Sequence, residues 1–364
     1  MAQDFKFLMT SASANSYRGW CLGQTCQTEW DSGPFRRHGL HFILDTSSRN
    51  DIRPLILDDA IQMRPSFKKL LIIILSLLVA ITLFAITMGF VITSDLGYDR
   101  VVLATSESWH DDWYTITQLD EQTFAIGEPR YWQRNYSYLI IGSERALLFD
   151  TGPGVRDISH VVSTLTELPV TALSSHPHYD HIGNNHRFDS VAWVRVPSIL
   201  SETENDRFQP SYLRGFTTRK IPPFEISEWW EPEQEIDLGQ RLLKVFFVPG
   251  HEAASFALLD IGRRQLFTGD FIYPGWLVAF APTSDLNEYL NSVRYLIQQT
   301  DGDETLFGAH SVPEHPSPAL PHSSLRDLER VLDAISAGRA SPTATLPIRI
   351  YPINQDMEIY LPPF

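Results

Sequence analysis

Metal-ligating side chains gather in one short stretch of this sequence, HPHYDH at residues 176–181. Its ligand-type residues are His176, His178, Asp180 and His181. Neutral imidazole and carboxylate are the groups that zinc prefers where no thiolate is present, and their spacing on an extended loop lets successive side chains face different ions. Because several such side chains held close together are costly without a cation, the stretch predicts a metal site.

The stretch resembles the HxHxDH signature of the metallo-β-lactamase superfamily, and the other positions of that family's pattern occur in the same order along this chain. They are Asp150 in FDTGPG, His251 in VPGHE, Asp270 in FTGD and His310 in GAH. The resemblance covers about residues 138–310 and the helix that follows. Asn184 and Ala254 stand where the family often has glycine, a departure that affects the loops more than the ligands.

The resemblance implies an α/β fold, the four-layer αβ/βα sandwich, with a site for two zinc ions along one edge. The implied ligands of the first ion are His176, His178 and His251, and those of the second are Asp180, His181 and His310. Asp270 is implied to bridge the two ions. Asp150 is implied to lie behind the ligands, where a hydrogen bond orients one of them.

Hydrolysis is the chemistry expected of such a site. Two cations about 3.5 to 4 Å apart lower the pKa of a bridging water, so that hydroxide forms near neutral pH and attacks without a nucleophilic side chain. Asp180 is then a candidate to take up the proton. Tyr273 stands three residues after Asp270, a spacing that resembles lactone- and thioester-cleaving branches, where such a tyrosine donates a hydrogen bond to the carbonyl oxygen. The alternative for Tyr273 is an ordinary half-buried tyrosine.

Several functions remain open at the level of sequence. The expected substrate is a small molecule with an ester, lactone or thioester bond, because residues 266–296 look most like members that cleave acyl thioesters, an acyl-CoA thioesterase branch among them. Trp276, Leu277 and Phe280 are then candidates for a wall that faces an acyl chain. The alternatives are a β-lactam or phosphodiester hydrolase of the same fold, a di-iron redox protein and a non-catalytic zinc-binding domain.

The strands that position the candidate ligands are predicted to end at them or just before them. Strands are expected at 137–142, 146–150, 170–174, 190–196, 241–248, 255–261 and 265–268. The spacing of apolar residues predicts helices at 155–167, 286–299 and 323–337. Strands that outnumber helices and are mixed with them indicate a layered α/β arrangement. Residues 348–351 and 357–361 are expected to form an edge hairpin.

A run of 24 residues without a charge, 70–93, precedes this region. As a helix it is about 36 Å long, enough to cross a hydrocarbon core of about 30 Å, so we expect one transmembrane anchor. A buried core helix and a cleaved signal peptide are the alternatives. Basic residues cluster before the run and only Arg100 closely follows it, which places the rest of the chain in the periplasm, the exterior or a secretory lumen. The sequon at 135–137 is a glycosylation site only in such a lumen.

Charge divides the chain into two unlike parts. Residues 1–94 hold 9 Lys and Arg against 7 Asp and Glu, whereas residues 95–364 hold 20 against 37, a net charge of −17. This acidity disfavours a nucleic-acid partner, which requires a clustered basic face. Residues 1–62 are expected to be either an extension without a folded role or a cytoplasmic tail, with Met63 as an alternative start. A basic flank and the anchor follow at 63–94, and a linker at 95–118. The catalytic domain is expected at 119–340 and a proline-rich tail at 341–364.

Overall fold

The chain divides into two compact units, Met1–Leu75 and Ser76–Phe364. The computed structural model describes residues 101–210 and 221–363, helical residues at 69, 72–80, 82 and 83, and three strands near the N-terminus. These strands form an antiparallel sheet and are β1 (Arg18–Leu22), β2 (Thr25–Glu29) and β3 (Phe42–Ile43). They lie within residues 1–62, and the interpretation of that segment as an extension or a cytoplasmic tail stays a prediction.

The predicted membrane anchor, 70–93, lies partly outside the described residues. Its described positions, 72–80, 82 and 83, are helical and exposed. Among all the residues that the structure describes, no helix combines the length and the apolar character needed to cross a membrane. The membrane anchor stays a prediction.

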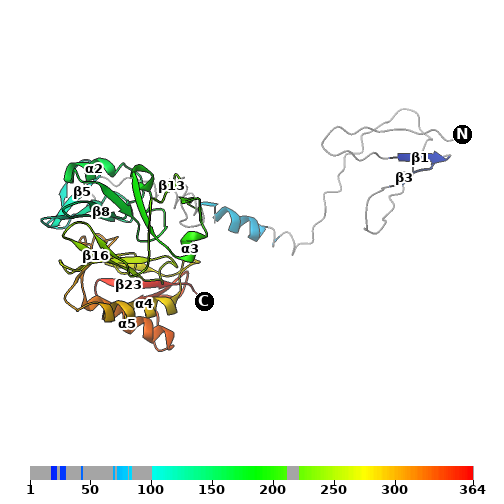
Figure 1. Ribbon diagram of the computed structural model, residues 1–364. Helices are drawn as coiled ribbons and strands as arrows, with labels where there is room; N and C mark the ends of the chain where they lie inside the picture. The colour runs from blue at the N-terminus through cyan, green and yellow to red at the C-terminus, as the bar shows by residue number, and fades with distance from the viewer. Residues whose placement is uncertain are drawn as a thin grey trace. The chain divides into compact units, whose positions relative to one another are not determined.

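The first large sheet of the second unit has the strand order β14-β10-β9-β8-β7-β6-β5-β4 (Figure 1). Its strands are β4 (Ser108–Trp109), β5 (Thr115–Asp120), β6 (Thr123–Glu128), β7 (Asn135–Ile141), β8 (Ala146–Phe149), β9 (Val170–Leu173), β10 (Ser190–Val194) and β14 (Glu228–Trp230). Neighbours from β4 to β8 are antiparallel, and those from β8 to β14 are parallel. The sheet is therefore mixed.

The second large sheet has the order β15-β16-β17-β18-β20-β21, and two small sheets flank the large ones. Its strands are β15 (Glu235–Asp237), β16 (Leu242–Phe247), β17 (Phe256–Asp260), β18 (Gln265–Gly269), β20 (Thr305–Gly308) and β21 (Ala319–Pro321). The small sheets consist of β11 (Thr203–Glu204), β12 (Arg207–Phe208) and β13 (Phe224–Glu225), and of β19 (Gly275–Val278), β22 (Arg349–Pro352) and β23 (Met357–Leu361).

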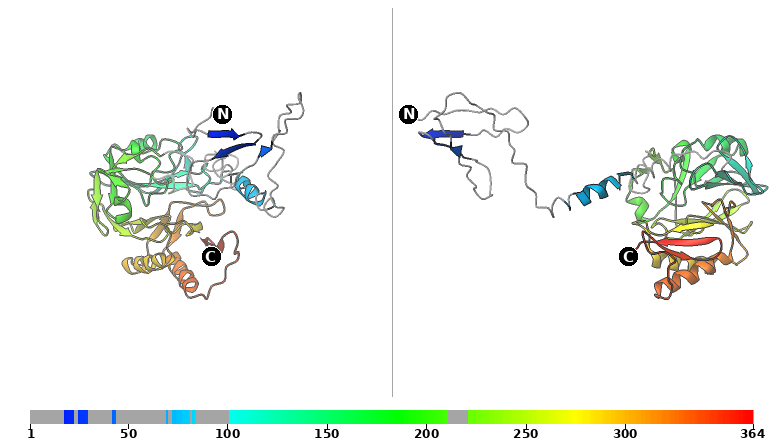
Figure 2. Two further views of the ribbon diagram at one scale, coloured as in Figure 1. Left: turned by 90° about the vertical axis from the view of Figure 1, so that its right-hand side faces the viewer. Right: turned by 180° about the vertical axis from the view of Figure 1, so that it is seen from behind.

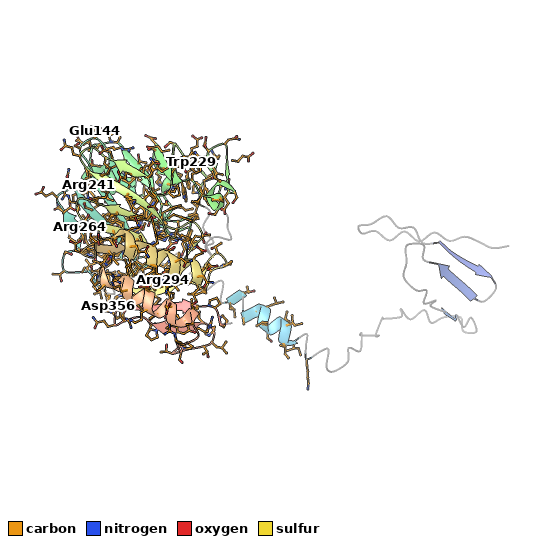
Figure 3. The ribbon with its side chains drawn as sticks, turned by 60° about the horizontal axis from the view of Figure 1, so that its bottom comes forward. Glu144, Trp229, Arg241, Arg264, Arg294 and Asp356 are labelled. Carbon is orange, nitrogen blue, oxygen red and sulfur yellow. The ribbon has the colours of Figure 1, made fainter. Side chains whose placement is uncertain are left out.

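Helices lie on the outer sides of the two sheets, as the front and rear views show (Figures 1 and 2). They are α2 (Ser159–Leu165), the short 3-10 turn Asn185–Arg187, α3 (Pro197–Leu200), α4 (Leu286–Gln299) and α5 (Ser323–Ser336). Arg294 of α4 pairs with Glu329 and Asp333 of α5, at 3.1 and 2.6 Å, and is labelled on the lower part of the unit in Figure 3.

The alternation of side chains in the second sheet creates two cores. In β16, Val245 packs between the two sheets with residues such as Leu148, while its neighbour Phe246 packs on the other side with Tyr289 and Leu328 of the helices. This is the period of two that a strand covered on both faces requires. The predicted α/β sandwich is confirmed, and both of its large sheets are mixed.

Most sequence-predicted elements occur, with shifts that have local causes. Helix α4 has the predicted bounds, and β7 and β8 form the predicted hairpin. The helix predicted at 155–167 is limited to Ser159–Leu165. The Asp157 carboxylate accepts the Ser159 N–H at 3.0 Å, and Thr166 is extended, which ends the helix.

The domain boundaries expected from the sequence differ from the packing. β4 and the start of β5 fall inside the expected linker, 95–118, and they pair with the first large sheet. In the expected tail, 341–364, β22 and β23 form the predicted hairpin, but β23 also pairs in parallel with β19. The alternate residues Met357, Ile359 and Leu361 are buried against the helical core, so the tail is part of the folded unit.

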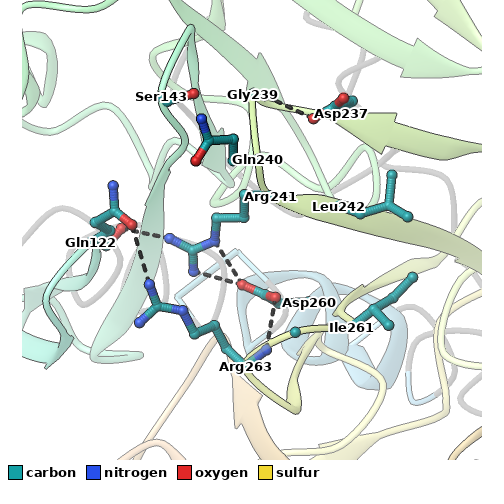
Figure 4. Close-up of a pocket in the computed structure, with 11 residues that line it drawn as sticks. Gln122, Ser143, Asp237, Gly239, Gln240, Arg241, Leu242, Asp260, Ile261 and Arg263 are labelled. Atoms are coloured by element: carbon teal, nitrogen blue, oxygen red, sulfur yellow. Dashed lines mark hydrogen bonds and ion pairs between the residues drawn. The ribbon is translucent and has the colours of Figure 1, made fainter.

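A buried ion pair ties the two sheets together at the edge where β16 begins and β17 ends. Arg241 contacts the Asp260 carboxylate at 2.6 Å and donates to the main-chain oxygen of Gln122 at 2.9 Å (Figure 4). It also donates to the main-chain oxygen of Ile141 at 3.0 Å. In the first sheet, Gln122 lies in the turn between β5 and β6 and Ile141 ends β7, whereas Asp260 ends β17 of the second sheet. One guanidinium therefore fastens both sheets.

Replacing this guanidinium is expected to destabilise the fold strongly. Arg241→Met leaves Asp260 buried without its partner, which costs about 3 to 5 kcal/mol of unfolding free energy. The matched control is Lys244→Met in the adjoining strand β16, whose ion pair with Glu233 is partly exposed, at 25% and 40%, and contributes less than about 1 kcal/mol. Urea unfolding followed by circular dichroism measures both, and equal losses in the two variants would contradict the prediction.

Candidate metal centre

The predicted ligands follow strands that end at one edge of the sandwich. In the first sheet β8 and β9 are parallel, so Asp150 and the loop at 174–184 leave the sheet at the same end. In the second sheet β17 is antiparallel to both β16 and β18, and β20 is parallel to β18. The loops after β16, β18 and β20 therefore also share one end, and they carry His251, Asp270 and His310.

The loop after β9 is pressed against the loop after β8. The Thr151 N–H donates to the His181 oxygen at 2.9 Å, and the Gly183 N–H donates to the Gly152 oxygen at 2.8 Å. A Cβ atom at Gly183 would lie 2.3 Å from the Gly154 nitrogen, so this close backbone approach requires glycine. The contact fixes the path of the ligand loop.

Three imidazoles and one carboxylate oxygen form the first group of ligand atoms. His176 Nε2 and His251 Nε2 lie 2.8 and 3.2 Å from His178 Nδ1. Asp270 Oδ2 lies 3.9 Å from His176 Nε2 and 3.5 Å from His251 Nε2. All four atoms lie within 4.8 Å of one another, a spacing that suits ligands of one cation.

The second group lies on the other side of Asp270. Asp180 Oδ2 lies 3.4 Å from both His181 Nε2 and His310 Nε2. Asp270 Oδ1, the other oxygen of the same carboxylate, lies 3.3 Å from His181 Nε2 and 2.9 Å from His310 Nε2. The two oxygens of Asp270 therefore face two different groups, which is the geometry of a bridging carboxylate.

The burial of these atoms indicates that they fit cations. His181 Nε2, His310 Nε2 and Asp270 Oδ1 are buried and have no hydrogen-bond partner within the described residues. Buried polar atoms without partners are rare and costly. Nitrogen and carboxylate donors in this number suit a pair of divalent ions of the zinc type. The chemistry of the donor set and the buried atoms without hydrogen-bond partners therefore both indicate that the site fits divalent cations.

Titration behaviour is consistent with such a site. Burial, helped by His181 and His178, holds the pKa of His176 well below its usual range, and burial lowers the pKa of His251 to about 4. Burial also lowers the pKa of His181, but the carboxylates of Asp180 and its neighbours outweigh it and raise that pKa above the usual value. His176 and His251 therefore favour the neutral form, whereas His181 favours positive charge.

The structure places Asp150 behind His181. Asp150 Oδ2 accepts from His181 Nδ1 at 3.0 Å, which leaves His181 Nε2 directed at the centre. Ser175 holds the carboxylate in turn, since its N–H donates to Oδ1 at 2.6 Å and its hydroxyl to Oδ2 at 3.0 Å. Such hydrogen bonds fix the orientation of a ligand imidazole.

Tyr273 lies beside the centre, but its hydroxyl points elsewhere. Its ring centroid is 5.1 Å from that of His310. The hydroxyl donates to the main-chain oxygen of Trp276 at 2.5 Å. To donate to a substrate, Tyr273 must give up this bond, so its proposed role requires a rotation of the hydroxyl or a local movement.

Two buried side chains next to the ligands were not predicted from the sequence. Asn135 Nδ2 donates to the main-chain oxygen of Asp180 at 3.0 Å and lies 3.3 Å from its Oδ2. Asn135 is only 2% exposed, which leaves no room for a glycan at the sequon. Glu252 is fully buried, and its Oε2 lies 3.5 Å from His178 Nε2. In the sequence, the position of Glu252 directly after the predicted ligand His251 was the feature that could have indicated this contact.

Comparisons with known proteins converge on one family. Residues 130–310 match the sequence model of the metallo-beta-lactamase superfamily. The chain is 29% identical over 220 residues to acyl-coenzyme A thioesterase MBLAC2 of Homo sapiens, which covers 52% of this chain and 77% of that protein. It is 27% identical over 180 residues to hydroxyacylglutathione hydrolase of Francisella tularensis subsp. novicida, and this alignment covers 49% of this chain and 63% of that protein. A metallo-beta-lactamase from Pontibacter korlensis, 16% identical, aligns with a TM-score of 0.47 over 60% of this chain and 99% of that one.

Removing the shared carboxylate is expected to weaken both ion sites. In Asp270→Asn, binding of two zinc ions per chain falls to one or none, whereas His310→Ala, which touches only the second group, retains one. Zinc at about 100 times its Kd stabilises a protein that binds it by about 2.7 kcal/mol. Plasma mass spectrometry after dialysis and thermal unfolding with and without EDTA measure these changes. Two tightly bound ions in Asp270→Asn would rule out the bridge.

Proposed function

Residues 130–310 form a hydrolase domain of the metallo-β-lactamase superfamily, and on that premise we propose that the protein hydrolyses a thioester or a related ester bond with the help of two zinc ions. The observation that carries this proposal is the position of Asp270 between two separate groups of buried ligand atoms. Two relatives are named for the hydrolysis of acyl conjugates, one of coenzyme A and one of glutathione.

The proposed reaction divides its tasks between the ions and the chain. Divalent ions held by the two groups supply Lewis acidity toward a carbonyl oxygen and toward water. Asp180 is buried, which raises its pKa, but His181 and His310 outweigh this and lower the pKa to about 2. Its carboxylate is therefore suited to accept a hydrogen bond from water and orient it, and to hold a proton only briefly. Asn135 keeps Asp180 in place through its main-chain oxygen.

An apolar row beside the centre is proposed to receive the acyl part of the substrate. Trp276 and Phe280 are 54% and 38% exposed, and Val278 lies between them on the same side of β19. The main-chain oxygen of Val278 accepts from His251 Nδ1 at 2.6 Å, so the row borders the first ligand group. Leu277 is fully buried in the helical core, which removes it from the predicted acyl wall.

Location bears on which acyl compound is the substrate. We propose that residues 70–93 anchor the protein in a membrane with the catalytic unit outside the cytoplasm, because the run is long and uncharged and the basic residues precede it. Coenzyme A is scarce outside the cytoplasm, so a different thioester, an ester or a lactone is the favoured substrate.

A hydrolysis screen of the zinc-loaded full-length chain tests the proposed reaction. Thioesters and lactones are expected to be cleaved faster than β-lactams and phosphodiesters. Asp180→Ala is expected to lower kcat by about 10²- to 10⁴-fold, because it removes the group that orients water. Circular dichroism checks that the variant is folded. Unchanged turnover in Asp180→Ala, or preference for β-lactams, would refute the proposal.

Substrate length in the same screen tests the apolar row. Trp276→Ala is expected to raise KM for long acyl chains and to leave short ones unchanged, because each buried methylene contributes about 0.8 kcal/mol. Leu346→Ala replaces another exposed apolar side chain, 71% exposed against 54% for Trp276, in the loop before β22 and serves as the control. If KM depends on acyl-chain length in both variants as it does in the wild type, the apolar row does not bind the acyl chain.

Fractionation tests the proposed location. Expressed at full length in a bacterial host, the protein is expected to remain with membranes after carbonate extraction, and protease added to intact spheroplasts is expected to digest the catalytic unit. Protection of that unit in intact spheroplasts, with digestion after lysis, would reverse the proposed orientation.

A further inference from the structure

Glu252 is a fully buried carboxylate that directly follows a predicted ligand, His251. Its Oε2 lies 3.5 Å from His178 Nε2, and the Thr283 hydroxyl donates to the same oxygen. Burial of a carboxylate is costly unless polar groups compensate it. The placement of Glu252 against an imidazole therefore calls for an explanation beyond packing.

His178 presents its two ring nitrogens to different surroundings. Nδ1 faces the first ligand group, at 2.8 Å from His176 Nε2 and 3.2 Å from His251 Nε2. Nε2 faces Glu252. A neutral imidazole that offers the lone pair of Nδ1 to a cation carries its hydrogen on Nε2. A carboxylate next to Nε2 favours that tautomer, because its negative charge attracts the Nε2–H hydrogen.

The other four imidazoles of the centre show the same principle. Each has a polar group at the ring nitrogen that faces away from the ligand group. The pairs are His176 Nδ1 with Ser175 Oγ at 3.0 Å, His181 Nδ1 with Asp150 Oδ2 at 3.0 Å, His251 Nδ1 with the Val278 oxygen at 2.6 Å, and His310 Nδ1 with the Gln133 oxygen at 3.2 Å. Glu252 occupies the corresponding position for His178.

His178 is also the ligand imidazole with the greatest exposure. Its side chain is 16% exposed, against 5% or less for the other four. Surrounding atoms therefore restrict its ring less than they restrict the others. A carboxylate that is itself held by Thr283 supplies the restraint that packing does not.

We propose that Glu252 is the positioning residue of His178, which fixes the tautomer and orientation of that ring and thereby sets the affinity of the first ligand group for its ion. The proposal rests on the metal centre of the proposed function and adds a residue to it. Glu252 acts through His178 and touches neither substrate nor ion. The loop after β19 contributes by holding the carboxylate through Thr283.

Two substitutions of Glu252 test this role in the full-length chain. Glu252→Leu removes the acceptor, and one of the two zinc ions is expected to bind about 10- to 100-fold more weakly while the other is nearly unaffected. Glu252→Gln keeps an acceptor of the same shape without the charge, and it is expected to restore most of the affinity. Thr283→Val removes only the support of the carboxylate, so it is expected to weaken the affinity by a smaller factor, no more than about fivefold.

Competition with a chromophoric chelator measures the zinc affinities. Nitrogen-15 NMR of labelled histidine reports the tautomer of His178 with and without zinc, and Glu252→Leu is expected to lose the Nε2–H form. Equal weakening of both zinc ions, or an unchanged affinity and tautomer in Glu252→Leu, would overturn the positioning role. A wild-type chain that binds no zinc would instead overturn the metal centre, and the tautomer measured in that chain would still decide the role of Glu252.

Discussion

Burial of ligand atoms that face one another is the constraint on which this structure depends. Imidazole nitrogens and carboxylate oxygens approach to between 2.8 and 3.9 Å at one edge of the sandwich, and three of these buried atoms lack hydrogen-bond partners within the described residues. Such an arrangement is unfavourable unless a cation compensates it. In this fold the strands of two sheets end at the same edge and bring these side chains together, and the core between the sheets keeps that edge intact.

Support for the centre comes from two directions. Next to the ligands, hydrogen bonds behind four of the five rings set their orientation, as Asp150 does for His181. At the edge of the sandwich where β16 begins, far along the strands from the ligands, Arg241 joins the first sheet to the second through Asp260 and two main-chain oxygens. The first kind of support acts on single side chains, and the second maintains the relation between the sheets that brings them together. Both rely on buried polar groups with satisfied partners.

The reaction and its substrate are determined by different parts of the unit. The two ligand groups, which include Asp180, form the candidate centre for hydrolysis, whereas the apolar row that includes Trp276 and Phe280 is the surface proposed to receive an acyl chain. β19, which carries most of this row, pairs with β23 from the C-terminal segment, and the Trp276 ring stacks on Tyr360 at 6.2 Å. The segment expected to be a tail thus shapes the surface beside the centre.

The ligand positions could be predicted from sequence, because HPHYDH is local and the remaining ligands follow apolar strands that have a clear period. The long amphipathic helix α4 was predictable for the same reason. Sequence alone did not reveal that the segment after 341 packs into the core, because strand pairing between β19 and β23 joins residues far apart in the chain. Nor could it assign Asn135 or Glu252, since a polar residue acquires its role only when folding buries it against a particular ligand. The residue types determined the chemistry, and the tertiary structure decided which groups surround each ligand, because burial and distance are properties of the packed sheets.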